Sequence, residues 1–553
     1  MDFSQISEII LEQGIKKAVK KIMGDQSCPD IIVGAPRDPA HGDLSSSIAL
    51  QLTKILKKNP VQIAETLKTD IIELLDKKIP GLIESVNVVN PGFINFILSK
   101  EYAYEVLKTV EKEGGSFGSS KNKDHHNIQI EFVSANPTGP LTVAHGRQAA
   151  VGDALANILK FMGNNVTKEF YINDEGRQIN VLGDSILYHY LAAFGKNGVF
   201  PEDGYQGEYI KGIALRIKDE YNDKFVKDPQ SSRDFFRKYG ADFLLNIIKE
   251  DLKQFKVDFD SWFSQKNITK SDIDKVLSLL KEKGYIYQQD GALWFKSTDF
   301  NDEKDRVVVK SDGQFTYFAP DIAYHKNKYE RGFDKLINIW GPDHHGYIPR
   351  ITAAAQALGH DHDAIKVLIV QLATIYKNGQ ELSMSTRKGE FISLKEVMDE
   401  VGEDVTKFCF LMRNLDTHLD FDLDKAKEQS ADNPVYYIQY AHARIWSIHE
   451  KAGAIDLSKA DLSLLKEEEE IAIAKTIGVF PKTVRSSAEK LEPFFVISYL
   501  NELASKFHNF YGKYKVITDD NELLKARLFL IDCVKICLAN GLKLLGVSLP
   551  KKM

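Results

Sequence analysis

Apolar and polar residues alternate over residues 127–133, and apolar residues recur at helical spacing over residues 148–161. The first pattern predicts a half-buried strand and the second a helix. Residues 134–147, which join them, contain two prolines and two glycines, as a tight turn does. A helix that begins there points unpaired N–H groups and the positive end of its dipole at the space above the strand. The turn is a candidate phosphate site, and an ordinary crossover loop is the alternative.

Strand-like and helix-like patterns continue to alternate as far as residue 430, which favours a mostly parallel α/β sheet. We expect further strands at residues 168–172, 292–295, 306–309, 335–340 and 365–372. Residues 178–290 are charged and largely helical, so we expect an insertion between two halves of the sheet there. The predicted α/β core covers residues 123–430.

The two ends of the chain differ from this core. Residues 1–122 mix helical and strand-like patterns, as a separate α+β unit does, and a Gly/Ser-rich joint at residues 114–120 marks its boundary. Residues 431–553 have helical spacing throughout. We expect an all-α bundle there, a form typical of a docking or recognition module, with helices at residues 436–452, 464–487, 494–514 and 522–545.

Composition and charge narrow the class of protein. A chain of 553 residues is long enough for three or four domains, and a net charge of −6 argues against a surface coated with basic residues. No apolar run is long enough to span a membrane, and the N-terminus has no signal-peptide pattern. Four cysteines are too few for a disulfide scaffold, and no Cys/His cluster has zinc spacing. We expect a cytoplasmic protein without a zinc site.

Two places carry residues suited to phosphates. His145 lies at the predicted helix start, where an imidazole can donate to a polyphosphate and where its charge is expected to be tunable near neutral pH. Arg387 and Lys388 lie in a polar loop, where they could stabilise charge that develops on phosphates in a transition state. The alternatives are a histidine bonded to nearby backbone and an ordinary surface turn.

Acidic and aromatic residues follow two later strand patterns. Tyr317 and Asp321 are four residues apart and could point into one pocket, and Asp343 lies beyond the next strand. Carboxylates with a tyrosine hydroxyl suit a cationic substrate, and a planar guanidinium could be held by two hydrogen bonds. A capping aspartate and a core tyrosine are the alternative. His344 and His345 have no third ligand at a motif spacing, which argues against a metal.

Aromatic and basic residues interleave where the helical region begins, at Tyr436, Tyr440 and Arg444. Such side chains stack on unpaired bases and hold phosphates in RNA-binding proteins. The stripe of an all-helical core explains the tyrosines equally well.

Taken together, these stretches resemble the arginyl-tRNA synthetases, a family of class I aminoacyl-tRNA synthetases. EFVSANPTGPLTVAHGR at residues 131–147 is similar to the family's first signature, with Thr142-Val143-Ala144-His145 in place of His-x-Gly-His. LSMSTRKG at residues 382–389 is similar to the second, usually Lys-Met-Ser-Lys-Ser. TYFAPDIAYH, GPDHHGY and NPVYYIQYAHAR resemble segments more specific to the arginine member.

The resemblance implies a Rossmann-type catalytic domain at residues 123–430, an N-terminal domain at residues 1–122 that reads the tRNA elbow, and an anticodon-binding domain at residues 431–553. It implies activation of L-arginine with ATP and Mg²⁺, followed by transfer of arginine to tRNA(Arg), by a monomer. The family usually needs bound tRNA for the first step. A catalytically inactive, synthetase-like tRNA-binding protein is the alternative.

Residue roles follow from the same resemblance. Those expected to contact arginine are Ser134, Asn136, His145, Tyr317, Asp321 and Asp343. Those expected to contact ATP are Thr142, His145, Gly146, Met384 and Ser385, with Gly146 letting the nucleotide approach the helix start. The catalytic residues are His145 with Arg387 or Lys388, and the tRNA contacts are Tyr436, Tyr440 and Arg444.

Overall fold

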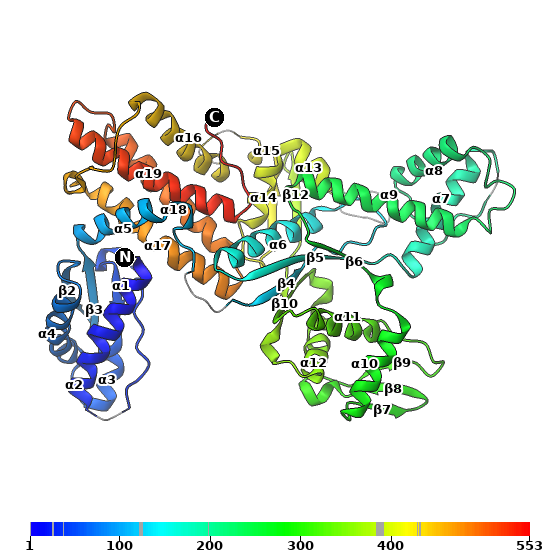
Figure 1. Ribbon diagram of the computed structural model, residues 1–553, viewed down its shortest axis with the longest axis horizontal. Helices are drawn as coiled ribbons and strands as arrows, with labels where there is room; N and C mark the ends of the chain where they lie inside the picture. Colours follow the sequence, from blue (N-terminus) through cyan, green and yellow to red (C-terminus); the bar gives the residue numbers. More distant parts are fainter. Residues whose placement is uncertain are drawn as a thin grey trace.

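The computed structural model describes residues 2–24, 27–36, 38–120, 125–196, 198–382, 392–428, 430 and 433–553. Its centre is a five-stranded parallel sheet in the order β11-β10-β4-β5-β6 (Figure 1). The strands are β4 (Asn127–Glu131), β5 (Asn165–Ile172), β6 (Ser261–Ser264), β10 (Lys335–Trp340) and β11 (Ile365–Ile369). The parallel α/β core predicted from the sequence is confirmed.

The order of the strands reverses between β4 and β10. The chain runs from β4 through α6 (Val143–Phe161) to β5 on one side, and from β10 through α12 (Ile348–Leu358) to β11 on the other. Open α/β sheets bind their ligands at the carboxyl ends of the strands that flank such a reversal. The turn after β4 lies there.

The sheet differs from the prediction at one edge. β6 lies inside residues 178–290, which were expected to be an insertion, yet it pairs in parallel with β5 from Glu169↔Ser261 to Ile172↔Ser264. Four strand residues between long helices are too few to show a periodicity. The helices that precede β6 form a unit with its own apolar core, made of α7 (Arg177–Ala192), α8 (Glu208–Tyr221) and α9 (Arg233–Gln254).

Two strands expected in the main sheet belong to another one. β8 (Ala292–Phe295) and β9 (Arg306–Val309) pair in antiparallel fashion with each other, and β8 also pairs with β7 (Ile286–Gln289). Asp290 and Gly291, both with positive φ, form the two-residue hairpin turn between β7 and β8. This sheet packs with α10 (Lys270–Glu282), α11 (Phe318–Glu330) and α12 around a separate apolar cluster, which we call the small lobe.

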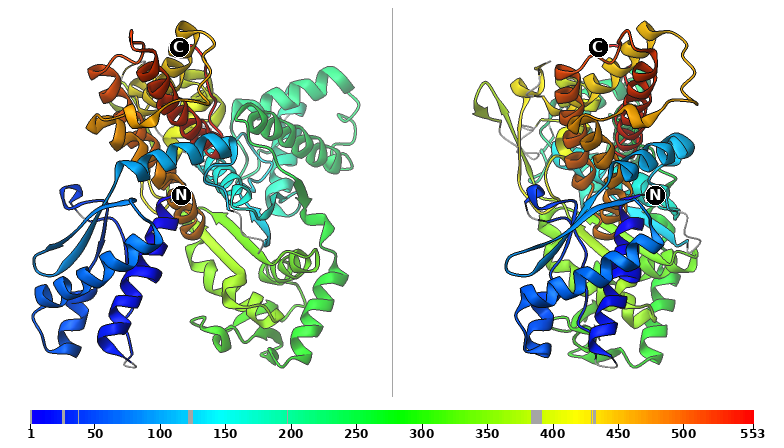
Figure 2. Two further views of the ribbon diagram at one scale, coloured as in Figure 1. Left: turned by 60° about the vertical axis from the view of Figure 1, so that its left-hand side comes forward. Right: turned by 90° about the vertical axis from the view of Figure 1, so that its left-hand side faces the viewer.

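The N-terminal unit combines a three-stranded sheet, in the order β1-β3-β2, with several helices. Its helical segments are α1 (Phe3–Ile9), a π-helical segment (Ile10–Ile15), α2 (Lys16–Met23), α3 (Ile48–Leu56) and α4 (Pro60–Lys78), of which the first three run on continuously. The strands are β1 (Leu44–Ser46), β2 (Ile83–Val89) and β3 (Phe93–Leu98). The left view of Figure 2 shows this unit at the lower left and the small lobe at the lower right.

The C-terminal region is a helical bundle, as expected. Its long helices begin and end within four residues of the predicted ranges, at α16 (Pro434–Ala452), α17 (Glu468–Lys490), α18 (Phe494–Lys513) and α19 (Asn521–Leu544). The helix α5 (Lys100–Glu113) packs against α17 and α19 and so joins the N-terminal unit to the bundle (Figure 1). In the part of the chain that the structure describes, no helix is long and apolar enough to cross a membrane.

A fourth sheet has three short strands in the order β13-β12-β14. Two short helices separate β13 from β14 in the chain, and a third follows β14. The elements are β12 (Ala373–Lys377), β13 (Gln380–Glu381), α13 (Leu394–Val401), α14 (Glu403–Leu411), β14 (Leu419–Asp422) and α15 (Leu423–Ala426).

Candidate active site at the carboxyl ends of the central strands

The turn after β4 holds two residues in the left-handed region of the backbone map. Val133 has φ 66° and Ser134 has φ 40°, a costly conformation that is most unusual for a β-branched side chain such as valine. The Ser134 hydroxyl donates to Glu131 Oε1 over 3.2 Å and accepts the backbone N–H of Tyr171 over 3.1 Å. The turn therefore holds the Ser134 side chain in one orientation between β4 and β5.

His145 lies in the first turn of α6, and its ring is bonded to the backbone. The N–H of Thr142 donates to Nδ1 over 3.2 Å, so Nδ1 carries no proton. Burial lowers the pKa of His145 to about 4, and Asp343 acts weakly in the opposite direction. The imidazole is thus neutral at pH 7 with its proton on Nε2, and the expectation of a charge tunable near neutral pH was wrong. Nε2–H is a neutral hydrogen-bond donor beside a helix N-terminus.

Gly146 has a packing role that the sequence did not indicate. A Cβ atom there would lie 2.6 Å from Leu394 Cδ1 and 2.9 Å from Phe410 Cε2. Helix α6 can approach α13 and α14 this closely only because residue 146 has no side chain. The missing Cβ faces the protein interior, so the close approach expected of a nucleotide is made by two neighbouring helices.

The segment that follows the second signature is bonded to the first. The N–H of Leu394 donates to the carbonyl of Leu141 over 2.8 Å, and Thr142 pairs with Ser393 as an isolated bridge. Ser393 and Glu396 form a capping box at the start of α13. The second-signature residues themselves, Met384, Ser385, Arg387 and Lys388, lie outside the described residues.

Asp321 lies in the first turn of α11, beside the ends of the central strands. Its Oδ2 accepts the hydroxyl of Tyr347. Burial raises the pKa of Asp321 to about 6, although the Tyr347 hydrogen bond lowers it. Sequence reasoning missed Tyr347, which is 26 residues away, although it closes the GPDHHGY motif.

Three other residues expected to contact arginine are exposed or are bonded elsewhere. Tyr317 is 84% exposed and does not share a buried pocket with Asp321. The Asp343 side chain is 78% exposed and lies 3.4 Å from His344 Nε2. Asn136 donates to Gln178 Oε1 at the start of α7 over 2.7 Å. Within the described ranges, no three His, Cys, Asp or Glu side chains come together as a metal site.

Comparisons with known proteins give the same assignment over the whole chain. The domain described as "tRNA synthetases class I (R), catalytic domain" matches residues 107–445, the "Arginyl tRNA synthetase N terminal domain" residues 10–98, and the "DALR anticodon binding domain" residues 438–553. The chain is 46% identical to the arginine–tRNA ligase of Bacillus pumilus over 99% of both chains. It is 45% identical to that of Bacillus subtilis over the full length of both.

The chain belongs to the arginyl-tRNA synthetase family. Its fold agrees with that of Thermus thermophilus arginyl-tRNA synthetase, with a TM-score of 0.76, 22% identity, and coverage of 98% of this chain and 99% of the other. The fold class predicted from the sequence is thereby confirmed.

Where the helical bundle begins, the predicted aromatic residues come together on α16. The rings of Tyr436 and Tyr440 lie 6.0 Å apart and nearly parallel. The Arg444 guanidinium lies 4.9 Å from the ring centre of Tyr440 and 5.3 Å from that of Tyr511 on α18. Arg444 and Tyr511 line a cleft of about 440 Å³ together with Lys451, Lys513 and Ile517. The stripe is therefore a partly exposed face and not a closed core.

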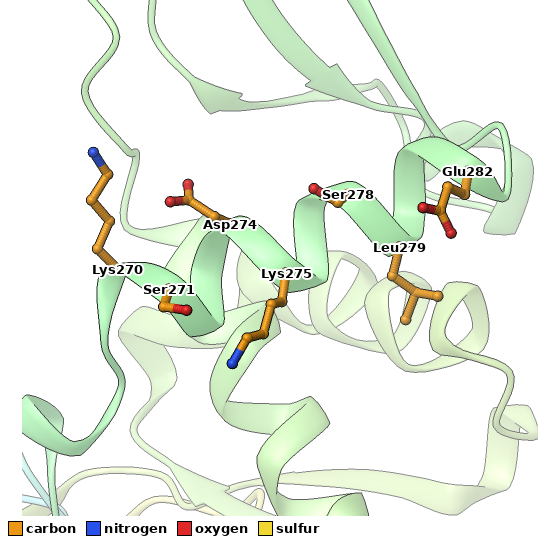
Figure 3. Close-up of a pocket in the computed structure, with 7 residues that line it drawn as sticks. All are labelled: Lys270, Ser271, Asp274, Lys275, Ser278, Leu279 and Glu282. Atoms are coloured by element: carbon orange, nitrogen blue, oxygen red, sulfur yellow. The ribbon is translucent and has the colours of Figure 1, made fainter.

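A larger hollow, of about 590 Å³, lies on the outer surface of α10. Figure 3 shows that its lining side chains all come from this one helix and fan away from one another. It holds none of the predicted site residues. This surface has no built site, and the candidate chemistry remains at the carboxyl ends of β4 and β10.

Proposed function

We propose that this protein is an arginine–tRNA ligase. The arginine carboxylate attacks the α-phosphate of ATP and releases pyrophosphate, and the terminal ribose of tRNA then attacks the adenylate and releases AMP. The observation that carries the proposal is the fixed Nε2–H of His145 at the α6 N-terminus. It provides a neutral donor in the crevice where α/β sheets bind nucleotides. Relatives that match over their full length have this activity in their names.

Phosphate binding falls to the start of α6. The helix N-terminus favours negative charge, and His145 Nε2–H donates without needing protonation. In this proposal Thr142 borders the nucleotide at the start of α6, and Met384 and Ser385 contact it from the second signature. Arg387 or Lys388 stabilises charge on the leaving pyrophosphate. Mg²⁺ enters with the phosphates of ATP, as part of the substrate.

Arginine recognition falls to Asp321. Its carboxylate is oriented by Tyr347 and, once ionised, accepts the planar fork of a guanidinium. A lysine ammonium cannot match that geometry and leaves acceptors unpaired. Ser134, Asn136 and His145 contact the backbone end of the amino acid or the adenylate. Tyr317 lies with Asp321 on the guanidinium side, and Asp343 helps to bind arginine. These roles are carried over from the family resemblance.

tRNA recognition involves both ends of the chain. We propose that residues 1–122 contact the tRNA elbow, that residues 123–430 carry the chemistry, and that residues 431–553 bind the anticodon with Tyr436, Tyr440 and Arg444. Tyrosine rings, which stack on bases, and a guanidinium, which pairs with phosphates, support the assignment of this face. We propose that the enzyme acts as a cytoplasmic monomer.

A charging assay tests the proposal. Purified protein is offered tRNA, ATP and each amino acid in turn, and we expect acid-stable labelling of tRNA with arginine alone. His145→Ala and Asp321→Ala should abolish charging while tRNA binding persists. If the wild type binds tRNA but charges nothing, the catalytically inactive alternative is correct.

A further inference from the structure

A row of polar side chains crosses the middle of the central sheet. Asn338 of β10 is the register neighbour of Glu131 of β4, and Glu131 is the neighbour of Glu169 of β5. Register neighbours on parallel strands point to the same face. All three side chains are buried, and buried polar groups are costly unless they are paired. Their partners come from the helix above them.

Helix α11 provides these partners from one side. Lys328 Nζ donates to Glu131 Oε2 over 2.6 Å, and Arg331, which caps the helix, donates to both oxygens of Glu169 over 2.5 and 2.9 Å. The Tyr324 hydroxyl lies 3.0 Å from Glu131 Oε2 and 2.6 Å from Glu169 Oε1. A buried cation, Lys328, and a partly exposed one, Arg331, thus neutralise two buried carboxylates, and Tyr324 joins the two pairs.

A continuous hydrogen-bonded path runs from this row to the start of α11. Lys328 Nζ also donates to Asn338 Oδ1 over 3.1 Å, and Asn338 Nδ2 lies 3.0 Å from His325 Nε2. His325 Nδ1 lies 2.8 Å from the carbonyl oxygen of Asp321. Burial lowers the pKa of His325 to about 3, so the ring is neutral. It accepts at Nε2 and donates at Nδ1, which satisfies both contacts.

The other end of the path is the turn after β4. Glu131 accepts from Lys328 through one oxygen and from the Ser134 hydroxyl through the other, over 3.2 Å. The path therefore connects Ser134 to Asp321 through Glu131, Lys328, Asn338 and His325. Its first and last residues are those assigned above to opposite ends of the bound arginine.

We propose that this path sets the distance between the two ends of the amino-acid site, so that Lys328, Asn338 and His325 are positioning residues that select side-chain length. The inference rests on the proposed function. Apolar contacts between a helix and a sheet tolerate small shifts along the helix axis. A fully paired polar network has one favourable arrangement, because any shift leaves buried groups unpaired. Asp321 is thereby held at a fixed separation from Ser134.

Asn338→Ala is the direct test, because it removes the partner shared by Lys328 and His325. Charging is measured with arginine, with L-homoarginine, which is one methylene longer, and with L-2-amino-4-guanidinobutanoate, which is one shorter. We expect the wild type to prefer arginine by about 10- to 200-fold, the range typical of one methylene. In the variant, we expect the ratio of kcat/KM for arginine to that for at least one analogue to fall about tenfold. The change should be mainly in KM.

Arg527→Met is the matched control. Arg527 pairs with Glu470 between α17 and α19 over 2.8 Å, and both are buried. Arg527→Met removes one member of a buried polar contact that lies in the bundle, outside the path, and the arginine-to-analogue ratios should not change. A general loss of stability would lower kcat/KM for all three substrates alike in either variant.

Asn338→Asp serves if the alanine variant does not fold. It keeps the shape and the acceptor for Lys328 but places an oxygen against the acceptor nitrogen of His325, and we expect a smaller fall in the same ratios. Unchanged ratios in a folded Asn338 variant that still charges arginine would overturn the inference and leave the proposed function intact. A wild type that charges no arginine would overturn the proposed function itself.

Discussion

The backbone N–H of Leu394 donates to the carbonyl of Leu141 over 2.8 Å, so the start of α13 is bonded to the turn that precedes α6. The Leu394 side chain also lies directly against Gly146. The two chain segments that border the signatures are thus in contact through both backbone and side chain. These two contacts fix the relative position of the segments within the folded scaffold.

Gly146→Ala should destabilise the protein. The new Cβ would lie 2.6 Å from Leu394 Cδ1, and overpacking of this kind typically costs about 1–3 kcal/mol. Urea unfolding measures the change. Gly212→Ala is the control, since a Cβ at this position in α8 meets nothing within 4 Å, and replacing an exposed helical glycine should stabilise by about 0.5–1 kcal/mol. Equal midpoints for Gly146→Ala and the wild type would contradict the packing role.

Asp321→Asn should weaken arginine use selectively. Hydrogen bonds to charged groups contribute about 1.5–3 kcal/mol, so we expect kcat/KM for arginine to fall by about 10- to 100-fold, with the KM for ATP little changed. Tyr347→Phe removes the hydroxyl that orients the carboxylate and should have a smaller effect. Steady-state charging kinetics measure both.

Tyr287→Phe is the control for Tyr347→Phe. Tyr287 donates to Asp305 over 3.0 Å within the small lobe. Its replacement by phenylalanine therefore removes a similar tyrosine–aspartate hydrogen bond away from the site. The assignment of Asp321 fails if Asp321→Asn leaves kcat/KM for arginine unchanged.

Arginine use should depend on pH through Asp321 and not through His145. The pKa of Asp321 is raised to about 6 by burial, so the carboxylate becomes protonated as the pH falls through 6. Since a guanidinium requires the ionised form, kcat/KM for arginine should decline below pH 6, by about tenfold per unit at the limit. His145, with a pKa near 4, stays neutral above pH 5. If the inflection near pH 6 in kcat/KM persists in Asp321→Asn, the inflection belongs to another group.

Tyr440→Ala should weaken tRNA use. Stacking of a base on an aromatic ring contributes about 1–3 kcal/mol, so we expect KM for tRNA to rise by about 5- to 150-fold while KM for arginine stays constant. Arg444→Gln should raise KM for tRNA as well, because the guanidinium lies over Tyr440. Filter binding and charging kinetics give the two measurements. Tyr285→Phe is the control, because Tyr285 lies in the small lobe and not on this face, and it should leave KM for tRNA unchanged.

Local periodicity was enough to place many of the elements that carry the site. The change from alternating to helical spacing located β4 and α6, and with them His145 at the helix start. The four bundle helices followed from their apolar spacing in the same way. The sequence did not show which sheet each strand joins. β8 and β9 have ordinary strand patterns, and only their pairing with each other and with β7 assigns them to the small lobe.

Contacts between distant residues could not be predicted from one sequence. Tyr347 reaches Asp321 across 26 positions, and Asn338 meets Glu131 only through the register of β10 with β4. The protonation state of His145 depends on burial that no local pattern encodes. Gly146 was interpreted as a ligand contact because its neighbours in space, Leu394 and Phe410, lie more than two hundred residues later in the chain.

Helix α11 belongs to two bodies at once. Phe318, Ala319, Ile322 and Ala323 pack into the small lobe, while Tyr324, Lys328 and Arg331 are bonded to the central sheet. The helix therefore connects the small lobe to the central sheet, and Asp321 lies in its first turn. A rotation of the small lobe against the sheet would therefore strain the hydrogen bonds of Tyr324, Lys328 and Arg331, and these bonds resist any displacement of the Asp321 carboxylate that starts at the outer surface of the lobe.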